Sequence, residues 1–401
     1  SPNILLLSLF THNYKLITCV LVRYRLLIAM ILRLSSRACV LSGSVRLKST
    51  LASFFDDLGK SGIILKSASS GIFENLALED WIHDHVDLQN RSLLLLWRNS
   101  PVVVIGRHQN PWQECNLPAT RRLGIPLARR RSGGGTVFHD FGNINMTFFT
   151  SKKKYDRHRN LKVVTSALKA LRPNLDVAAT DRFDILLNGH YKISGTAAKL
   201  GRSSAYHHCT LLCSVDRSVL SSVLKSNTAE VIKSNATPSV PSPVKNLLEV
   251  DPTLDSSTIM EAIASQYNSE FGFDSPVITV DPTHEALMPG IHKMAHDLQT
   301  WEWIYGKTPK FSVCTALVVD DVNIKLDMDV RNGTVERCAL EIPADWLSPE
   351  IVNELISTLK GSRYCPNETA VLVAAFMRTR SMTDNVAEKI HRLCEEMLSV
   401  M

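Results

Sequence analysis

The chain has 401 residues, enough for two or three domains, and 45% of them are hydrophobic, enough for a sizeable core. This composition excludes a disordered chain, a collagen-like fibre and a small disulfide-rich scaffold. The formal net charge is +6, from 45 basic and 39 acidic residues, but residues 1–55 hold seven basic residues and no acidic ones. Beyond them, the remaining 38 basic and 39 acidic residues nearly cancel. The net charge therefore gives no indication of nucleic-acid binding.

The acid-free segment at residues 1–55 has the composition of a mitochondrial transit peptide. From Met30 onward it is rich in Arg, Ser and Leu, which is typical of such leaders. A membrane anchor is the alternative, but basic residues interrupt the apolar stretches well before the roughly 20 residues that a spanning helix needs. We therefore expect import into the mitochondrial matrix, with the leader removed between Arg37 and Phe55. The nine cysteines form no CxxC pair, which fits free thiols in a reducing compartment.

Hydrophobic periodicity and turn residues predict helices and strands in the first half of the chain. Residues 71–86 have the spacing of an amphipathic helix, and residues 161–171 form a second helix that Pro173 ends. The neighbours Asn188 and Gly189 predict a tight β-hairpin. Short apolar runs predict strands at residues 93–97, 101–105, 144–149, 183–187, 190–194 and 207–213.

The pattern changes towards the C-terminus. We predict a loop at the Ser- and Pro-rich residues 226–244, a helix at 256–271 and a linker at 281–290. Apolar and polar residues then alternate strictly through residues 322–330, which predicts a strand with one exposed face. A turn at Asn332 and Gly333 and a helix that starts at Ser348 and Pro349 follow. The predicted parts are a leader at residues 1–55, a main domain at 56–285 and a small C-terminal domain at 286–401.

A run of three arginines and three glycines, at residues 129–131 and 133–135, leads into a predicted strand. Glycines lose more backbone entropy on folding than other residues and contribute no side chain. Such a segment lets a ligand approach the backbone closely, with N–H groups facing a phosphate or a carboxylate. An ordinary flexible turn is the alternative, but the neighbouring arginines favour a ligand-binding loop.

Lys192 lies in the second strand of the predicted hairpin, shortly before Ser194 and Gly195. A cation fixed on a rigid strand is suited to stabilise a phosphate or a developing oxyanion. A solvated lysine at a sheet edge is the alternative, and Lys192 alone does not distinguish the two. The polar residues from Arg107 to Asn110 also follow a strand end, where binding sites often form, although an ordinary turn has the same composition.

Two histidines and a cysteine, His207, His208 and Cys209, lie together in a predicted strand. Adjacent strand residues point to opposite faces, and the spacing matches no common zinc pattern, so we expect no metal site. Cys209 has two interpretations. It is a nucleophile that forms a thioester or, as we expect, a small buried residue of the strand.

Four motifs occur in a fixed order along the chain: GRHQNPWQEC (106–115), RRRSGGGTVFHD (129–140), KISGTA (192–197) and YHHCTLL (206–212). Together they resemble the lipoate–protein ligase and lipoyltransferase family. HHCTLL and the later segment LQTWEWIYGKTPKF (298–311) are similar to its vertebrate mitochondrial members, and the likeness covers about residues 60–401. The resemblance implies an α+β fold, with a mixed sheet and flanking helices as in biotin–protein ligases, plus a small α+β C-terminal domain.

The resemblance also implies how the main domain binds a lipoyl group or its adenylate, lipoyl-AMP. The glycines and Phe138 would face the lipoyl chain, Arg182 and Lys192 would touch the phosphate and the acyl carbonyl, and residues 235–240 would cover the adenine. Where bacterial members commonly have a glycine, this chain has Cys209, whose side chain would crowd a nucleotide and puts ATP-driven activation in question. The candidate site residues are Arg130, Ser132, Gly133, Gly134, Gly135, Phe138, Arg182, Lys192, Thr210, Thr237, Ser239 and Val240.

The implied reaction is transfer of a lipoyl group to one lysine of a lipoyl domain, with Lys192 as the catalytic residue. Lys192 and backbone N–H groups of the glycines would hold the oxyanion, and the strands at 102–105 and 144–149 would line an apolar groove for the dithiolane. The acceptor lysine must lose a proton, and His139 and Asp140 are the candidate bases.

The donor of the lipoyl group stays open: it is lipoyl-AMP, as substrate or intermediate, or a lipoylated carrier such as the glycine-cleavage H protein. The acceptors would be the acyltransferase subunits of 2-oxoacid dehydrogenase complexes. One alternative is a complete lipoate–protein ligase, which would need Mg²⁺ and ATP. The other is a catalytically dead protein that only binds lipoyl domains. We expect a monomer with no tightly bound cofactor and no nucleic-acid or membrane partner.

Overall fold

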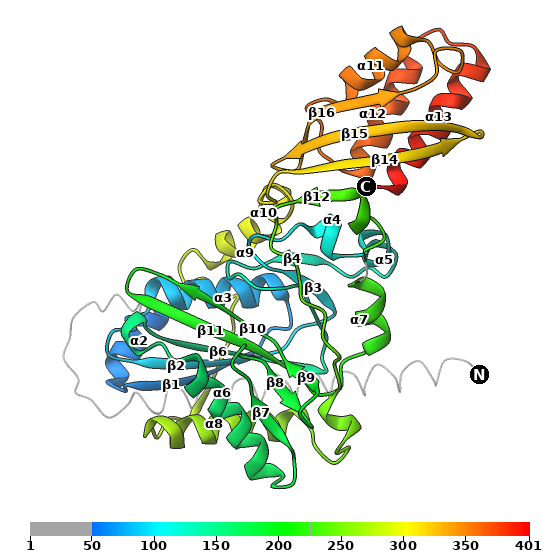
Figure 1. The fold of residues 1–401 in the computed structure, drawn as a ribbon. Helices are drawn as coiled ribbons and strands as arrows, with labels where there is room; N and C mark the ends of the chain where they lie inside the picture. Colours follow the sequence, from blue (N-terminus) through cyan, green and yellow to red (C-terminus); the bar gives the residue numbers. More distant parts are fainter. Residues whose placement is uncertain (1–49, 225) are drawn as a thin grey trace, which may run out of the picture. The chain divides into compact units, whose positions relative to one another are not determined.

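The structure, a computed structural model, describes residues 50–224 and 226–401. Most of the predicted leader lies outside the described residues. The main domain is built on a six-stranded mixed sheet in the order β10-β11-β6-β2-β1-β13 (Figure 1). β1 pairs in parallel with β2 and β13, and the other neighbours are antiparallel. The strands are β1 (Gly62–Ser67), β2 (Ser92–Trp97), β6 (Asn143–Ser151), β10 (Thr196–Leu200), β11 (Ser204–Leu212) and β13 (Val277–Val280).

Apolar side chains cover both faces of this sheet. Along β1, Ile63 and Leu65 belong to one core and Ile64 to the other, because successive strand residues point to opposite sides. Burial on both faces explains why β2 is a continuous apolar run instead of an alternating one. Two helices pack on each face (Figure 1): α3 (Ile72–His85) and α9 (Ile291–Gln299) on one, α6 (Arg157–Leu171) and α8 (Ser256–Phe271) on the other.

Two three-stranded sheets flank the large one and carry the segments that the sequence singled out. The first, in the order β4-β3-β5, contains β3 (Val102–Ile105), β4 (Leu127–Arg129) and β5 (Val137–His139). The second contains β7 (Val177–Ala179), β8 (Ile185–Leu187) and β9 (Tyr191–Ser194). Asn188 and Gly189 turn β8 into β9 with positive φ of 53° and 66°, as type I′ hairpins require. The predicted hairpin is therefore confirmed.

The C-terminal part of the chain forms a second unit, in which a sheet packs against helices. Strands β14 (Phe311–Val319), β15 (Val322–Arg331) and β16 (Thr334–Glu341) form an antiparallel sheet, with Asn332 and Gly333 at the last turn. Its apolar face packs in one core with α11 (Pro349–Leu359), α12 (Pro366–Arg378) and α13 (Asp384–Ser399). Both the strict alternation through residues 322–330 and the α+β fold class are thus confirmed.

The segment 226–244 is more than the loop that its composition predicted. It contains a short 3₁₀ turn, η2 (Ala229–Val231), and β12 (Ile232–Ser234), which pairs with β14 as the fourth strand of the C-terminal sheet. Because β12 has only three residues and its partner strand is distant in the sequence, no local pattern predicts it. The other short elements are α4 (Pro111–Glu114), α5 (Leu117–Arg122), η1 (Lys152–Lys154), α7 (Arg217–Val223), η3 (Leu247–Glu249) and α10 (Trp301–Ile304).

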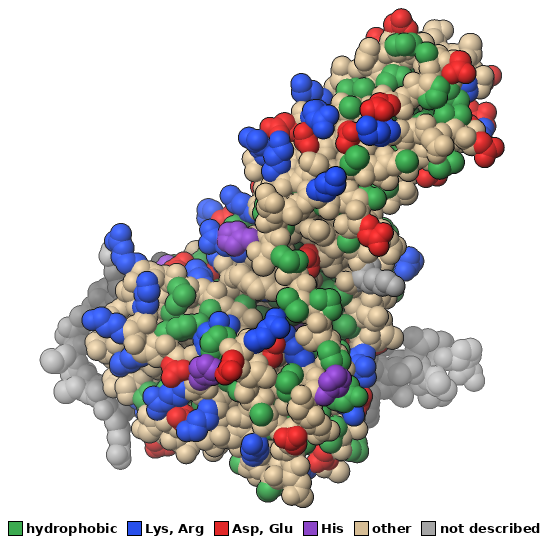
Figure 2. All heavy atoms as spheres, in the orientation of Figure 1, with side chains coloured by type: hydrophobic (Ala, Val, Ile, Leu, Met, Phe, Trp, Pro, Cys, Tyr) green, Lys and Arg blue, Asp and Glu red, His purple; other side chains and the backbone are tan. Residues whose placement is uncertain are grey.

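The boundary between the main and C-terminal domains, placed at residue 285 from the sequence, stays a prediction. Helices α9 and α10 follow it yet contact the main domain, since Trp81 Nε1 donates to the carbonyl of Pro289 (3.2 Å) and Trp303 Nε1 to that of Arg129 (2.7 Å). These contacts favour a boundary between α10 and β14. Within the described ranges, no helix is both long and apolar enough to cross a membrane. Basic and acidic side chains are interspersed over the face shown in Figure 2.

Helix α2 (Leu51–Leu58) begins inside the segment that the sequence assigned to the leader. Its N-cap, Thr50, accepts a hydrogen bond from the N–H of Ser53. Leu51 and Phe55 are 5% and 0% exposed, in the same apolar core as α3. A leader that ended at Phe55 would take both side chains out of the core, so we place its end before Leu51.

We predict that a chain beginning at Ser49 is as stable as one beginning at Arg37, whereas a chain beginning at Asp56 is destabilised by about 3–5 kcal/mol. This magnitude is typical for loss of one large buried side chain. Urea denaturation of the three chains measures the difference, and N-terminal sequencing of the imported protein should find Thr50 retained. Equal stability of all three chains would show that α2 belongs to the leader.

Candidate active site

A cavity of about 560 Å³ lies where the glycine loop (residues 133–135), strands β9, β10 and β11 and residues 237–244 meet. The structure brings the candidate site residues together at this cavity. Ser132 and Gly133 lie just behind its wall, and their contacts are described below. The other ten line it: Arg130, Gly134, Gly135, Phe138, Arg182, Lys192, Thr210, Thr237, Ser239 and Val240.

Arg130 holds the glycine loop in place. Its guanidinium donates to the carbonyl oxygens of Gly133 (2.6 Å) and Gly135 (2.7 Å) and to Ser132 Oγ (3.0 Å). Burial lowers the pKa of Arg130 to about 10, which leaves the group charged at neutral pH. Because its N–H groups are engaged with the loop, we expect Arg130 to shape the loop instead of binding a phosphate directly.

Gly134 is the position in the loop that requires glycine. Its φ is +86°, and a Cβ there would lie 3.0 Å from the Arg130 guanidinium and 3.2 Å from the Cβ of Ala197. At Gly133 a Cβ would meet nothing within 4 Å. The second glycine, Gly134, is therefore the residue whose missing side chain lets the loop pack closely against Arg130 and Ala197.

Gln109 ties the glycine loop to the segment at residues 237–240. This fully buried amide accepts hydrogen bonds from the N–H of Gly106 (2.8 Å) and from Thr136 Oγ1 (2.9 Å). It also donates to Ser239 Oγ (3.0 Å), and the N–H of Ser239 donates to Glu114 Oε1 (3.2 Å). Gln109 of the polar stretch after β3 thus supports the loops around the cavity without lining it, whereas Glu114, which the sequence analysis did not identify, lines it.

Lys192 lies on β9, with its Nζ 2.8 Å from Asp184 Oδ1 at the cavity wall. The backbone of β9 is fixed there, since the N–H of Lys192 donates to the carbonyl of Pro243 (2.8 Å). Gly195 N–H donates to Thr210 Oγ1 (3.0 Å), and a Cβ on Gly195 would lie 3.8 Å from both Lys192 Nζ and Thr210 Oγ1. The Lys192 ammonium group, the Thr210 hydroxyl group and the Gly195 backbone therefore meet at one point. No local pattern in the sequence identifies Asp184 as a site residue.

Residues 71–268 match the family model of the lipoyl protein ligase A/B catalytic domain. The chain is 54% identical over 354 residues to the mitochondrial lipoyl amidotransferase LIPT1 of Homo sapiens, covering 87% of this chain and 95% of that protein. It is 34% identical over 306 residues to the lipoate-protein ligase A of Psychrobacter cryohalolentis, covering 75% and 88% of the two chains. The chain belongs to the lipoyl protein ligase A/B family. It is accordingly an acyl-transferring enzyme of lipoyl chemistry.

Solved structures of lipoate–protein ligases share this family fold. LipL1 of P. falciparum, solved in complex with lipoate, has a TM-score of 0.54 at 24% identity and covers 84% of this chain and 99% of its own. A lipoate-protein ligase A solved with ATP has a TM-score of 0.51 at 22% identity and covers 62% of this chain and 100% of its own. At these identities the likeness establishes the fold only.

Neither candidate base fits its role in this family member. Burial, together with the neighbouring Arg130 and His208, lowers the pKa of His139 to about 3, so its imidazole is uncharged at neutral pH and is a weak base. Its Nδ1 is engaged with Asn99 (2.9 Å). Asp140 accepts from the N–H groups of Gly142 and Asp216 at 2.7 and 2.8 Å and does not line the cavity. Asp140 therefore shapes the backbone after β5, whereas His139 lines the cavity.

The two histidines of β11 point to opposite faces, as predicted. His207 is fully buried, and its Nδ1 lies 3.3 Å from Asn160 of α6. The ring of His208 contacts Glu79 of α3 and Ser132. Cys209, between His208 and Thr210, is 2% exposed and belongs to the apolar core on the α6 side. Burial raises the pKa of its thiol to about 12, so the group is protonated at neutral pH and is not a thiolate nucleophile.

We predict that Gly134→Val abolishes lipoyl transfer, because a β-branched residue adopts positive φ only under strain and the new side chain would push against Arg130. The matched variant Gly133→Ala places a methyl group in open space and should lose far less activity. Initial rates with a lipoyl donor measure both. Equal losses would indicate that the two glycines serve only loop flexibility.

We also predict that Cys209→Ala keeps transfer within about threefold of the unaltered enzyme and that Cys209→Gly, which introduces the residue that the family resemblance implies here, keeps at least a tenth of it. A protonated, buried thiol contributes packing but no nucleophile. Intact-mass analysis of enzyme quenched during turnover is expected to show no lipoyl group on Cys209. A lipoyl thioester at this residue would contradict the assignment.

Proposed function

We propose that this chain is a lipoyl amidotransferase that moves a lipoyl group from an activated donor to one lysine ε-amine of a lipoyl domain. The observation that carries the proposal is the meeting of Lys192, Thr210 and the glycine loop at one cavity. Membership in the lipoyl protein ligase A/B family and 54% identity to a lipoyl amidotransferase support the same reaction.

The reacting carbonyl would lie between Lys192 and the glycine loop. When the acceptor amine attacks it, the carbonyl oxygen becomes an oxyanion, and the Lys192 ammonium with backbone N–H groups would stabilise that charge. One such donor typically contributes about 3–4 kcal/mol. Collapse of the tetrahedral intermediate forms the new amide and expels the leaving group, which takes up the proton that the attacking amine loses, and Arg182 at the cavity wall would face a phosphate there.

The apolar wall of the cavity suits the lipoyl chain. It is contributed by three strand residues and α3, through Trp97, Val104, Val137 and Leu76. Trp97 is fixed by its Nε1, which donates to Thr147 Oγ1 (3.0 Å). We predicted an apolar groove lined by the strands at 102–105 and 144–149. The first strand contributes Val104 to the lining, but the second, β6, contributes the polar residue Asn145.

Two kinds of donor fit this cavity. Lipoyl-AMP would place its adenine against residues 237–240, of which Thr237, Ser239 and Val240 line the wall. A lipoylated carrier such as the glycine-cleavage H protein would present an amide instead, and its amine would be the leaving group. A complete ATP-dependent ligase is the second candidate, favoured by the 34% identity to a lipoate-protein ligase A. A dead lipoyl-domain-binding protein is disfavoured, because the cation and the glycine loop are both in place.

The acceptors we propose are lipoyl domains of 2-oxoacid dehydrogenase complexes in the mitochondrial matrix. The names of the human and mouse relatives include the word mitochondrial, and the acid-free N-terminal composition supports the same compartment. The enzyme would act as a monomer without a resident cofactor, and Mg²⁺ and ATP would take part only if it also activates lipoate.

A three-donor assay tests the proposal. Purified enzyme is incubated with an apo-lipoyl domain and, in turn, with lipoate plus MgATP, with lipoyl-AMP or with lipoylated H protein, and the acceptor is then weighed by mass spectrometry. Lipoylation from lipoyl-AMP or H protein alone identifies a transferase, and lipoylation from lipoate plus MgATP identifies a ligase. No mass gain with any donor would overturn both.

Lys192→Ala should lower the transfer rate about a hundredfold or more while leaving the fold intact, because it removes one stabiliser of the oxyanion. Lys245→Ala is the matched control. Lys245 lies over the Tyr191 ring at 5.1 Å and does not line the cavity. Rates are measured with the donor that the three-donor assay identifies. A Lys192→Ala rate within threefold of the control would remove Lys192 from the mechanism.

A further inference from the structure

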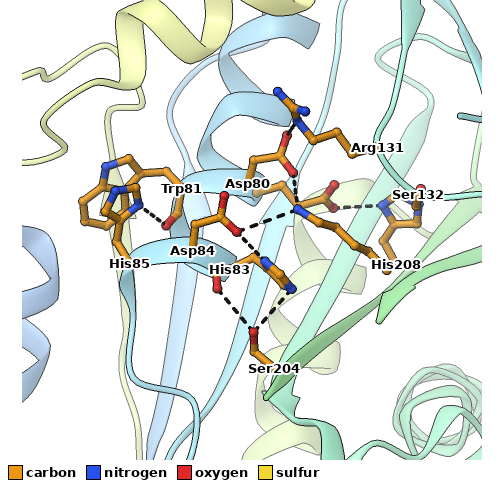
Figure 3. A network of polar contacts seen from close by, with 11 residues as sticks. Asp80, Trp81, His83, Asp84, His85, Arg131, Ser132, Ser204 and His208 are labelled. Carbon is orange, nitrogen blue, oxygen red and sulfur yellow. Dashed lines mark hydrogen bonds and ion pairs between the residues drawn. The ribbon is translucent and has the colours of Figure 1, made fainter. Parts of the chain in front are cut away.

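A chain of four polar groups, three of them buried, connects α3 to the glycine loop. Glu79 Oε1 lies 2.9 Å from His208 Nδ1, His208 Nε2 lies 2.9 Å from Ser132 Oγ, and Ser132 Oγ accepts from Arg130 Nε at 3.0 Å. Figure 3 shows His208 between Ser132 and α3. Glu79 and Ser132 are 1% exposed and Arg130 is 5% exposed. We refer to Glu79, His208 and Ser132 as the relay.

The chemistry of its ends fixes the direction of the outer hydrogen bonds. A guanidinium only donates, so Ser132 Oγ accepts from Arg130, and the Glu79 carboxylate accepts from His208 Nδ1. Ser132 Oγ can donate to His208 Nε2 or accept from it, and the bond is made in either case. Glu79 also accepts from Thr147 Oγ1 (2.6 Å). The relay therefore runs from a buried cation to a buried carboxylate with every link satisfied.

Glu79 remains ionised despite its burial. Burial alone would raise its pKa, but His208, Thr147 and the charge of Lys199 outweigh that effect, and the pKa of Glu79 is lowered. A buried carboxylate is retained at such a position only if its partners are well placed. Breaking one link would leave a buried polar group without its partner, which is unfavourable.

We propose that Glu79, His208 and Ser132 are positioning residues that hold the Arg130 guanidinium against the carbonyl groups of Gly133 and Gly135, so that the loop is preformed for the lipoyl donor. This inference rests on the proposed lipoyl transfer. His208 also lines the cavity, which makes proton transfer from the acceptor lysine the competing role. Both ring nitrogens, however, are already engaged, Nε2 with Ser132 and Nδ1 with Glu79, so neither is free for a substrate proton.

Two substitutions at His208 separate positioning from proton transfer. A glutamine amide has its nitrogen and oxygen on one carbon, as imidazole has its two nitrogens, so His208→Gln can donate to Glu79 and accept from Ser132. It cannot serve as a base. His208→Leu fills similar space but makes neither bond. His83→Gln is the control, because His83 lies one turn along α3 and contacts Asp84 and Ser204 but no loop residue (Figure 3).

The readouts are the transfer rate, the KM for lipoyl-AMP and the Kd of lipoyl sulfamoyl-adenosine, a donor analogue that does not react. We expect His208→Leu to lower kcat/KM at least twentyfold and to weaken analogue binding about tenfold. His208→Gln should stay within threefold of the His83→Gln control in both. Loss of transfer in His208→Gln with normal analogue binding would overturn positioning in favour of proton transfer, and full activity of His208→Leu would overturn any role.

Ser132→Ala provides a second test if His208→Leu does not fold, since it removes one hydroxyl group and leaves the packing unchanged. It should weaken analogue binding and lower kcat/KM in the same direction, about fivefold or more, and unchanged values would overturn the relay. Thermal unfolding establishes that each variant is folded. Absence of transfer by the unaltered enzyme would overturn the proposed function instead, and the analogue titration would then still test whether the relay positions the loop.

Discussion

Two neighbouring buried arginines hold the irregular backbone of the site. Arg129 donates to the carbonyls of Ile304 and Gln109, both at 2.8 Å, and Arg130 donates to carbonyls of the glycine loop. A guanidinium without water loses several kcal/mol of solvation unless its N–H groups find acceptors. Loop carbonyls removed from solvent need donors equally. Each arginine therefore supplies hydrogen-bond donors to backbone carbonyl groups that have no sheet partner. The shape of the cavity depends on these hydrogen bonds.

Helix α3 supplies the countercharge for two further cations on this side of the site, Arg131 and Lys199. Its central turn contains two buried carboxylates, Glu79 and Asp80, of which Asp80 pairs with Arg131 (2.8 Å) and Lys199 (3.0 Å). Burial raises the pKa of Asp80 against the opposing effect of both cations. The same helix packs Trp81 and Ile82 into the apolar core. One face of the helix thus packs on the sheet, while its carboxylates balance positive charge next to the glycine loop. The geometry of the site therefore depends on the packing of the domain.

Elements with a local signal could be predicted from the sequence, and elements defined by distant partners could not. The turn at Asn188 and the alternation through residues 322–330 are properties of adjacent residues, and both are found where expected. The glycine loop was recognisable for the same reason. In α3, however, helical spacing alone cannot place charged residues inside, because the partners of Glu79 and Asp80 arrive from β11, β10 and residue 131. Asp184 and β12 likewise acquire their roles only from residues brought close by the fold.

Lys192 combines a rigid backbone with a weakly held side chain. Its strand is fixed by the Asn188 hairpin and by the bond to Pro243, while its ammonium pairs with Asp184 at the cavity wall, where both side chains are about one-quarter exposed. Ion pairs with access to water contribute only about 0–1 kcal/mol. In the proposed reaction, a phosphate or an oxyanion would therefore replace Asp184 at small cost, whereas a fully buried pair would resist exchange by several kcal/mol. Because Lys192 lies at the cavity wall, its ammonium group stays next to the cavity and its ion pair with Asp184 is easily exchanged. Stabilisation of a transient anion requires both properties.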